Sequence, residues 1–431
     1  MRYENLVFAL SAAVVLSLAP VQPACSGGAD EGAIQALQQL VKNQQQQLDA
    51  QANEIETLKG MLNSLLGQTE QNTAAIAEKA KEMENLQSES MVVSKIPRVD
   101  VSVYGQINRA GLWADNGDAS QVYFVDNIFS STRMGIDAAA KASDDLNIGG
   151  KLEYEIISNS SNEVNQDQPD SSATMKIRHA DTFAQSKTLG KISLGQGSTS
   201  SDGTAERDLS GTSVVSYSAV QYQAGGQKWY DDSSDTVLLS QVKSVIDNMD
   251  GLSRRDRLRY DTPVFSGWQL SASAIEAEAF DGALSYSRKF GGTAVAAAFG
   301  YATPGDLAAW ENQYSGSLSV LLGSGLNFTL AGGIQEYDVV DRDNPDYWYG
   351  KLGYKTSLFP QGASAFAVDY GMWNDFDLNG DEAQSLGLAF VQEIADWGTE
   401  FYLAYRLYAL ERDLADIADV NSVMAGARVK F

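Results

Sequence analysis

The last twelve residues constrain the fold more than any other stretch of this 431-residue chain. Alternate side chains there form an apolar set and a partly cationic set, Val423, Ala425, Ala427, Val429 and Phe431 against Met424, Gly426, Arg428 and Lys430. A period of two with unlike faces indicates a strand between two different media. The apolar face ends on a carboxy-terminal Phe and suits the closing strand of a lipid-facing barrel. A strand of a soluble β-sandwich is the alternative on this segment alone.

Composition excludes one class of partner and leaves the fold class to periodicity. The formal net charge of −25 argues against nucleic-acid binding, because a phosphate backbone requires a basic surface. The hydrophobic content of 44% is no higher than in soluble proteins, but a barrel wall exposes only every second residue to lipid.

Residues 1–29 are predicted to be an export signal. Arg2 precedes an apolar run, 6–19, that is too short to span a membrane as a mature helix. Small residues allow cleavage after either Ser26 or Ala29. Cys25 is the only cysteine, which excludes an intramolecular disulfide, and its sequence context is poor for a lipid anchor.

Residues 30–96 are predicted to form an α-helical coiled coil that serves as a periplasmic stalk. Apolar residues keep a heptad spacing from Ile34 to Val93, with Gln and Asn at several core positions, and Pro97 ends the pattern. At 1.5 Å per residue the rod would be roughly 90 Å long. A single amphipathic helix packed on a domain is the alternative.

Residues 97–431 are predicted to form an all-β domain, a 16-stranded antiparallel transmembrane β-barrel. Alternating segments are separated by connections that are in turn short and long. Seven connections are short: 142–146, 189–190, 262–267, 291–292, 323–325, 359–362 and 394–397. Eight are long and acidic: 114–128, 158–172, 201–253, 276–282, 303–310, 338–346, 374–382 and 411–419. Fifteen connections join sixteen strands, an even number that leaves both ends on the short-turn side.

The expected strands place charges on one face. Glu153 and Glu155 alternate with Leu152 and Ile156, and Arg406 alternates with apolar neighbours. Unpaired ions cost several kcal/mol when they are buried dry. The inner face is therefore expected to be wet.

Five segments resemble the Gram-negative porin family, in an alphaproteobacterial-like form. They are 103–108, 126–135, 177–180, 190–197 and 425–431, and they leave out the stalk. The resemblance implies a trimeric outer-membrane barrel that passes small hydrophilic solutes, with the third long loop folded inward to narrow the pore. The barrel-closing strand, with Val423, Gly426, Val429 and Phe431, resembles the family's assembly signal, although Met424 stands where a polar residue is usual.

The third long loop is here 201–253, and the resemblance implies that its first half enters the pore. Its carboxylates are expected to face arginines of the wall, so that the pore constriction comprises Asp202, Glu206, Asp208, Arg133, Arg178, Arg255, Arg257 and Arg259. Such an arrangement gives a transverse field across a narrow wet pore. The alternative is that these arginines form ordinary salt bridges within the wall, with Glu153, Glu155 and their neighbours.

Other candidate sites are weak. His179 is the only histidine and is expected to face away from the lumen with Met175, Ile177 and Phe183, in a contact between subunits. Asp375, Asp377 and Asn379 match the start of a calcium loop, but Leu386 replaces its bidentate Glu, so they are only a weak metal candidate. No cofactor and no enzymatic activity are expected.

The sequence therefore predicts a homotrimeric porin of the outer membrane of a Gram-negative bacterium, contacting lipid, ions and small hydrophilic solutes. The acidic loops favour a modest preference for cations. Two alternatives stay open: a substrate- or anion-selective porin, and a structural tether whose stalk contacts the cell wall.

Overall fold

The computed structural model describes residues 39, 42–43, 45–46, 48–64, 98–276 and 278–431. The predicted signal, 1–29, and most of the predicted stalk, 30–96, lie outside these residues. Residues 48–64 are helical. Within the part of the chain that is described, no helix is both long and apolar enough to cross a membrane.

Nineteen strands follow residue 98. They are β1 (Val99–Asp115), β2 (Ser120–Asp126), β3 (Arg133–Lys141), β4 (Leu146–Ile157), β5 (Thr174–Ser186), β6 (Gly190–Ser198), β7 (Lys228–Asp231), β8 (Thr236–Gln241), β9 (Arg254–Asp261), β10 (Trp268–Ile275), β11 (Phe280–Phe290), β12 (Thr293–Thr303), β13 (Asn312–Leu321), β14 (Leu326–Glu336), β15 (Asp346–Phe359), β16 (Gly362–Asn374), β17 (Glu382–Ile394), β18 (Thr399–Glu411) and β19 (Val420–Lys430). The short helices are η1 (Ile128–Ser130), η2 (Val220–Tyr222), α2 (Val242–Val245), η3 (Gly305–Leu307) and η4 (Ala395–Trp397).

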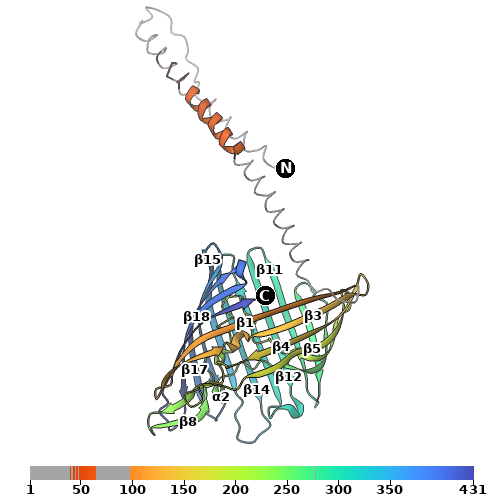
Figure 1. The fold of residues 1–431 in the computed structure, drawn as a ribbon, viewed down its shortest axis with the longest axis vertical. Coiled ribbons are helices and arrows are strands. Elements are labelled where there is room, and N and C mark those ends of the chain that lie inside the picture. The colour runs from red at the N-terminus through yellow and green to blue at the C-terminus, as the bar shows by residue number, and fades with distance from the viewer. Residues whose placement is uncertain (1–38, 40–41, 44, 47, 65–97, 277) are drawn as a thin grey trace, which may run out of the picture. The chain divides into compact units, whose positions relative to one another are not determined.

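Seventeen of the strands form one antiparallel sheet that closes on itself, while β7 and β8 form a separate hairpin. β2 and β3 pair with successive parts of β1 and together occupy one position in the wall. The sheet is therefore a closed barrel of sixteen strand positions (Figure 1), as the sequence predicts.

The carboxy-terminal strand closes the barrel. β19 pairs with β18 on one side and β1 on the other. At its end, the Gly105 N–H donates to the Phe431 carbonyl at 2.9 Å and the Phe431 N–H donates to the Gly105 carbonyl at 3.0 Å. A Cβ on Gly105 would lie 2.6 Å from the Phe431 ring, so glycine is what lets this ring cover the seam.

The connections alternate as predicted, but the first long one is shorter than expected. The predicted loop 114–128 contains β2, and only 116–119 form the turn. In β2, Tyr123 and Val125 are buried inside, whereas Val122 and Phe124 are exposed on the outer face. β2 is only seven residues long, and η1 separates it from β3. Because the alternating stretch is so short, it is hard to recognise in the sequence.

The outer surface of the barrel is apolar and the inner surface is mixed. Phe401 and Leu403 are about half exposed on the outside, and Tyr402 and Ala404 between them are buried. Because successive side chains of a strand point to opposite faces, this alternation places the apolar side chains where lipid would lie.

Candidate functional site: the lumen and its inward loop

Residues 199–253, here named the inward loop, fold into the barrel and pack against one side of it. The loop holds the β7–β8 hairpin and α2, which lie at the lower end of the barrel in Figure 1. Trp229, Val242 and Ile246 of the loop are fully buried in a cluster with Tyr349 and Tyr408 of the wall. We name the inner wall of β14–β19, β1 and β2, which supplies the wall side of this cluster, the packed half.

Buried ion pairs fasten the loop to the packed half. Lys351 of β15 pairs with Asp208 and donates to the Ser216 carbonyl at 2.7 Å. Arg406 of β18 pairs with Asp369 of β16 at 2.7 Å, and the Ser216 hydroxyl donates to the same carboxylate at 2.7 Å. Asp208 is therefore bound to a lysine of the packed half and does not face the predicted arginines. The sequence shows that the loop is acidic, but not which wall its backbone follows.

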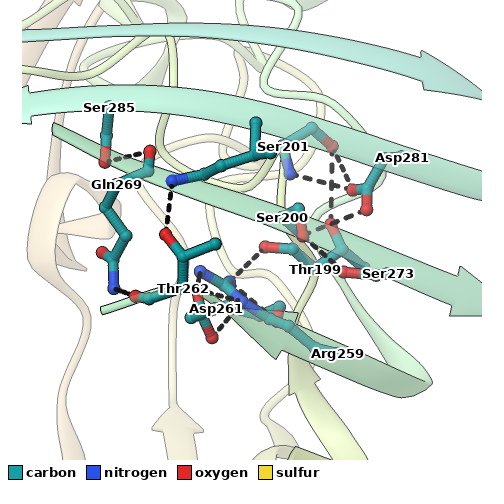
Figure 2. A network of polar contacts seen from close by, with 12 residues as sticks. Thr199, Ser200, Ser201, Arg259, Asp261, Thr262, Gln269, Ser273, Asp281 and Ser285 are labelled. Atoms are coloured by element: carbon teal, nitrogen blue, oxygen red, sulfur yellow. Dashed lines mark hydrogen bonds and ion pairs between the residues drawn. The ribbon is translucent and has the colours of Figure 1, made fainter. Parts of the chain in front are cut away.

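The base of the inward loop is held by the opposite side of the barrel. The Ser201 N–H donates to Asp281 of β11 at 2.9 Å, and Ser200 donates to the same side chain (Figure 2). Arg259 donates to the Thr199 carbonyl at 2.6 Å and pairs with Asp261 at 2.7 Å (Figure 2). Arg259 thus forms a salt bridge within its own strand and anchors the loop.

Arg257 is also committed to the wall. Its guanidinium pairs with Asp181 of β5 at 2.7 Å and donates to the Ser198 carbonyl at 2.9 Å. Its side chain is only 4% exposed. This buried guanidinium stabilises the junction of β5, β6 and the inward loop, and it contributes little charge to the lumen.

The arginine that meets the loop carboxylates is Arg254, not Arg255. Arg254 lies 3.4 Å from Asp202, whereas Arg255 is exposed and forms no ion pair with any described residue. Arg254 is the first residue of β9, and its side chain reaches the lumen although strict alternation from Arg257 would place it on the other face. The positive φ of 56° at Ser253 marks an irregular entry into this strand. Counting by parity from Arg259 therefore misses Arg254.

A central cavity of about 680 Å³ lies between the loop and the wall formed by β3–β6 and β9, which we name the open half. The predicted residues Arg133, Arg178, Asp202 and Glu206 line it. They are joined by Arg254, Asp250 and Arg428, which are not part of the predicted constriction. Because Arg254 and Arg255 are adjacent, the sequence leaves open which of the two faces the loop carboxylates. This adjacency is the one sequence signal that pointed to Arg254.

The wall side of this cavity is a charge network. Arg178 pairs with Glu153 at 2.7 Å and with Glu155 at 3.3 Å. The Tyr104 hydroxyl donates to Glu153 at 2.7 Å. The Arg133 guanidinium donates to the Ser130 hydroxyl at 3.3 Å and retains other donors toward the cavity.

The loop side carries three carboxyl groups close together. Asn248 donates to Glu206 at 3.1 Å, and the Gly203 N–H donates to Asp250 at 2.6 Å. Burial, reinforced by the charge of Asp202, raises the pKa of Glu206 to about 7. Burial and the neighbouring Glu206 and Asp202 charges raise the pKa of Asp250 well above its ordinary value. Glu206 and Asp250 therefore titrate at higher pH than ordinary carboxyl groups, at the place where the inward loop and the wall line the same cavity.

His179 faces the lumen, contrary to the sequence prediction. The pairing of β4 with β5 shifts by one residue between Glu153, opposite His179, and Tyr154, opposite Ile177, so that Arg178 is the extra residue. This bulge keeps Ile177 on the outer face but turns His179 and Phe183 inward, where both line a second cavity. One extra residue in a strand reverses the parity of those that follow.

The weak metal candidate at 375–381 is satisfied by protein donors. Arg412 binds Asp377 at 2.8 Å and Asp381 at 2.6 Å, and Arg342 donates to Asn379 at 3.2 Å. The Gly380 N–H donates to Asp375 at 2.7 Å. Across the described ranges, no group of three or more His, Cys, Asp or Glu side chains is arranged to hold a metal ion.

The barrel and its inward loop match known proteins. The family model described as Gram-negative porin matches residues 73–412. The chain belongs to the Gram-negative porin family. Family membership implies an outer-membrane channel rather than an enzyme.

Solved structures agree with this fold at low sequence identity. OmpTdeltaL8, a loop L8 deletion mutant of the outer membrane protein OmpT of Vibrio cholerae, superimposes with a TM-score of 0.51 at 17% identity, over 78% of this porin and 100% of that chain. An anion-selective porin from Comamonas acidovorans gives 0.51 at 14% identity, over 77% and 100%. The outer membrane channel DcaP of Acinetobacter baumannii gives 0.50 at 14% identity, over 79% and 99%. A comparison with curated proteins found no matching sequence.

Proposed function

We propose that this porin forms a water-filled channel for passive diffusion of ions and small hydrophilic solutes, with a modest preference for cations. The observation that carries the proposal is the central cavity, which lies between the inward loop and a wall of fixed charges. Charged side chains of both signs that face one another across a lumen favour hydrated solutes over apolar ones.

The constriction in this proposal differs from the predicted set. It consists of Arg133, Arg178 and Arg254 on the wall, and of Asp202, Glu206 and Asp250 on the loop. Asp208, Arg257 and Arg259 position the loop, and Arg255 lies outside the set. Opposed charges at the narrow part create a transverse field, so the balance at the mouth decides which ion enters more readily.

The cation preference follows from the mouth. All eight long connections carry more acidic than basic residues. Exposed charges act over a Debye length of about 10 Å at 0.1 M salt and about 3 Å at 1 M. The preference should therefore be measurable at low salt and fade as salt rises.

The experiment is the reversal potential across a planar bilayer under a salt gradient, with Arg254→Gln compared to Arg255→Gln. Arg254 opposes the loop carboxylates, whereas its neighbour is exposed without an ion pair to the described residues. We expect Arg254→Gln to increase cation preference clearly and Arg255→Gln to change it little. Equal shifts in the two variants would contradict the proposed constriction.

An anion-selective channel is the second candidate, because one observation favours it. Arg133, Arg178, Arg254 and Arg428 come from four different strands and line the same cavity. In that case wild type would show anion preference at low salt, and Arg254→Gln would abolish it.

We further propose that the protein is a homotrimer with a periplasmic coiled-coil stalk at 30–96. Leu48, Ile55, Leu58 and Leu62 occupy heptad core positions, and each is more than half exposed in the single chain. Association of three copies would cover this apolar stripe. Sedimentation of the full chain in detergent should give a trimer, and Leu48→Asp with Ile55→Asp should weaken it. A wild-type dimer would contradict the proposal.

A further inference from the structure

A second cavity, here named the turn-side cavity, has no assigned role. It measures about 650 Å³ and shares no lining residue with the central cavity. Lys187 and Val264 from two short turns line it, together with wall residues of β3–β6 and β9. Its size falls in the range of about 300–1,000 Å³ that is usual for small-molecule sites.

The cavity is electropositive after its internal pairs are removed. Arg257 neutralises Asp181, and Arg259 neutralises Asp261. Three lysines then remain against a single carboxylate, Lys151, Lys187 and Lys191 against Asp137. This local surplus of positive charge contrasts with the net charge of −25 of the whole chain.

Close ion pairs with carboxylates do not neutralise these lysines. Among the described residues Lys191 and Lys187 form no ion pair, and Lys151 approaches Glu153 only to 3.9 Å. The Lys191 ammonium lies 4.5 Å from the centroid of the Phe183 ring, and the Lys151 ammonium lies 5.1 Å from that of Tyr104. Aromatic faces hold an ammonium without neutralising it, so its hydrogen-bond donors stay available to an anion.

The cavity also has an apolar side. Phe183 and Val264 line it, and Val264 is 64% exposed. A small inorganic anion would leave this surface unused, whereas an anion with an apolar body would cover it. The combination of ammonium donors and apolar surface selects an organic carboxylate.

We propose that the turn-side cavity is a binding subsite for a small organic carboxylate, with its anionic group held by Lys151 and Lys191 and its apolar body against Phe183. The subsite deepens the proposed function and rests on it, because solutes reach the cavity through the open lumen or from the short-turn end. The acidic long loops lie at the other end, so an anion arriving from the short-turn side does not cross them.

The test uses benzoate as the probe and the folded full-length protein in detergent micelles. Equilibrium dialysis should show saturable benzoate binding. Acetate lacks the apolar body and benzyl alcohol lacks the carboxylate, so each should bind at least about tenfold more weakly. In planar bilayers, benzoate added on the short-turn side should interrupt single-channel current more often than benzoate added on the long-loop side.

The variant Lys151→Gln with Lys191→Gln should weaken benzoate binding about tenfold or more. The matched control is Arg288→Gln with Lys289→Gln, which removes two positive charges from exposed positions at the short-turn end of β11, outside the cavity. The control should bind benzoate as wild type does.

Three outcomes would overturn the subsite: equal binding of acetate and benzoate, equal binding of benzyl alcohol and benzoate, or equal weakening in the two double variants. Failure of the channel is a separate result. If the protein conducts no ions but lysine-dependent benzoate binding persists in micelles, the proposed channel is wrong, and the cavity binds carboxylates without a role in diffusion.

Discussion

The packed and open halves of the lumen share one strand pattern but differ in what faces inward. In the packed half the inward positions include Tyr347, Tyr349, Trp373, Tyr402 and Tyr408, all buried. In the open half they include Arg133, Glu153, Glu155 and Arg178. Large aromatic side chains each remove about 150–250 Å² from water when covered. The inward loop therefore packs on the aromatic wall and leaves the charged wall to the lumen.

Charged side chains have different roles in the two halves. Arg406 and Lys351 of the packed half are essentially unexposed, and they hold the loop through Asp369 and Asp208. Arg178 in the open half keeps 16% of its side chain exposed beside the cavity. Charges sealed under the loop stabilise one loop position, and charges beside the cavity set the field that a solute meets.

The largest expected effect comes from breaking a pair in the packed half. Asp369→Ala leaves the Arg406 guanidinium, only 1% exposed, without its carboxylate, and removes the acceptor of Ser216. Loss of one partner of a buried pair costs about 3–5 kcal/mol. We expect a decrease of that size in the free energy of unfolding, measured with urea in lipid vesicles.

The control for this prediction is Asp396→Ala, the same change at an exposed position in a short turn. It should change the free energy of unfolding by less than about 0.5 kcal/mol. Similar losses in both variants would show that Asp369 is not specially placed.

The carboxyl groups of the inward loop lie between the two halves, and a change of pH tests their effect on ion selectivity. Glu206 has a pKa of about 7 against an ordinary 4.5, because it is buried near Asp202. Asp250, Arg207 and Arg254 also act on it, and Asn248 donates to it. Between pH 8 and pH 6 Glu206 gains a proton, so the constriction loses negative charge and cation preference should fall. The reversal potential at the two pH values measures this.

The same shift predicts the pH dependence of stability. A carboxyl whose pKa is raised by folding contributes stability that is fully present below pH 4.5 and is lost as pH rises through about 7. Glu206→Gln should reduce both pH dependences, while Glu278→Gln, at an exposed position, should retain them. A pH response unchanged by Glu206→Gln would place the titrating group elsewhere, with Asp250 the first to examine.

The smallest expected effect on stability comes from the open half. Arg178 lines the central cavity, and Arg178→Gln leaves Glu153 with its hydrogen bond from Tyr104. We expect the free energy of unfolding to fall by about 2 kcal/mol, the usual contribution of a hydrogen bond to a charged group, because Glu153 keeps the Tyr104 donor. Cation preference should nevertheless increase. Arg288→Gln, exposed on β11, should change neither quantity, and a loss as large as that of Asp369→Ala would erase the distinction between the halves.

Much of the fold was predictable because it depends on local periodicity. The short and long connections, the sixteen strand positions and the closing strand to Phe431 follow from alternation and turn residues. The inward orientation of Arg406 and Glu153 followed from the same alternation. β2 was missed because a break at η1 cuts its pattern to seven residues.

A closed barrel with unlike faces, acidic long loops and a carboxy-terminal seam can be predicted from the residue pattern alone, since strand parity and turn chemistry act over a few neighbouring residues. Three features could not be predicted in this way: Asp208 pairs with Lys351, Arg254 and not Arg255 lies at Asp202, and a bulge turns His179 inward. Those outcomes depend on where the inward loop finds enough apolar wall to cover, and on single-residue irregularities that reverse side-chain direction. The position of the loop and these irregularities depend on contacts between segments far apart in the chain. The periodicity of the sequence does not contain that information.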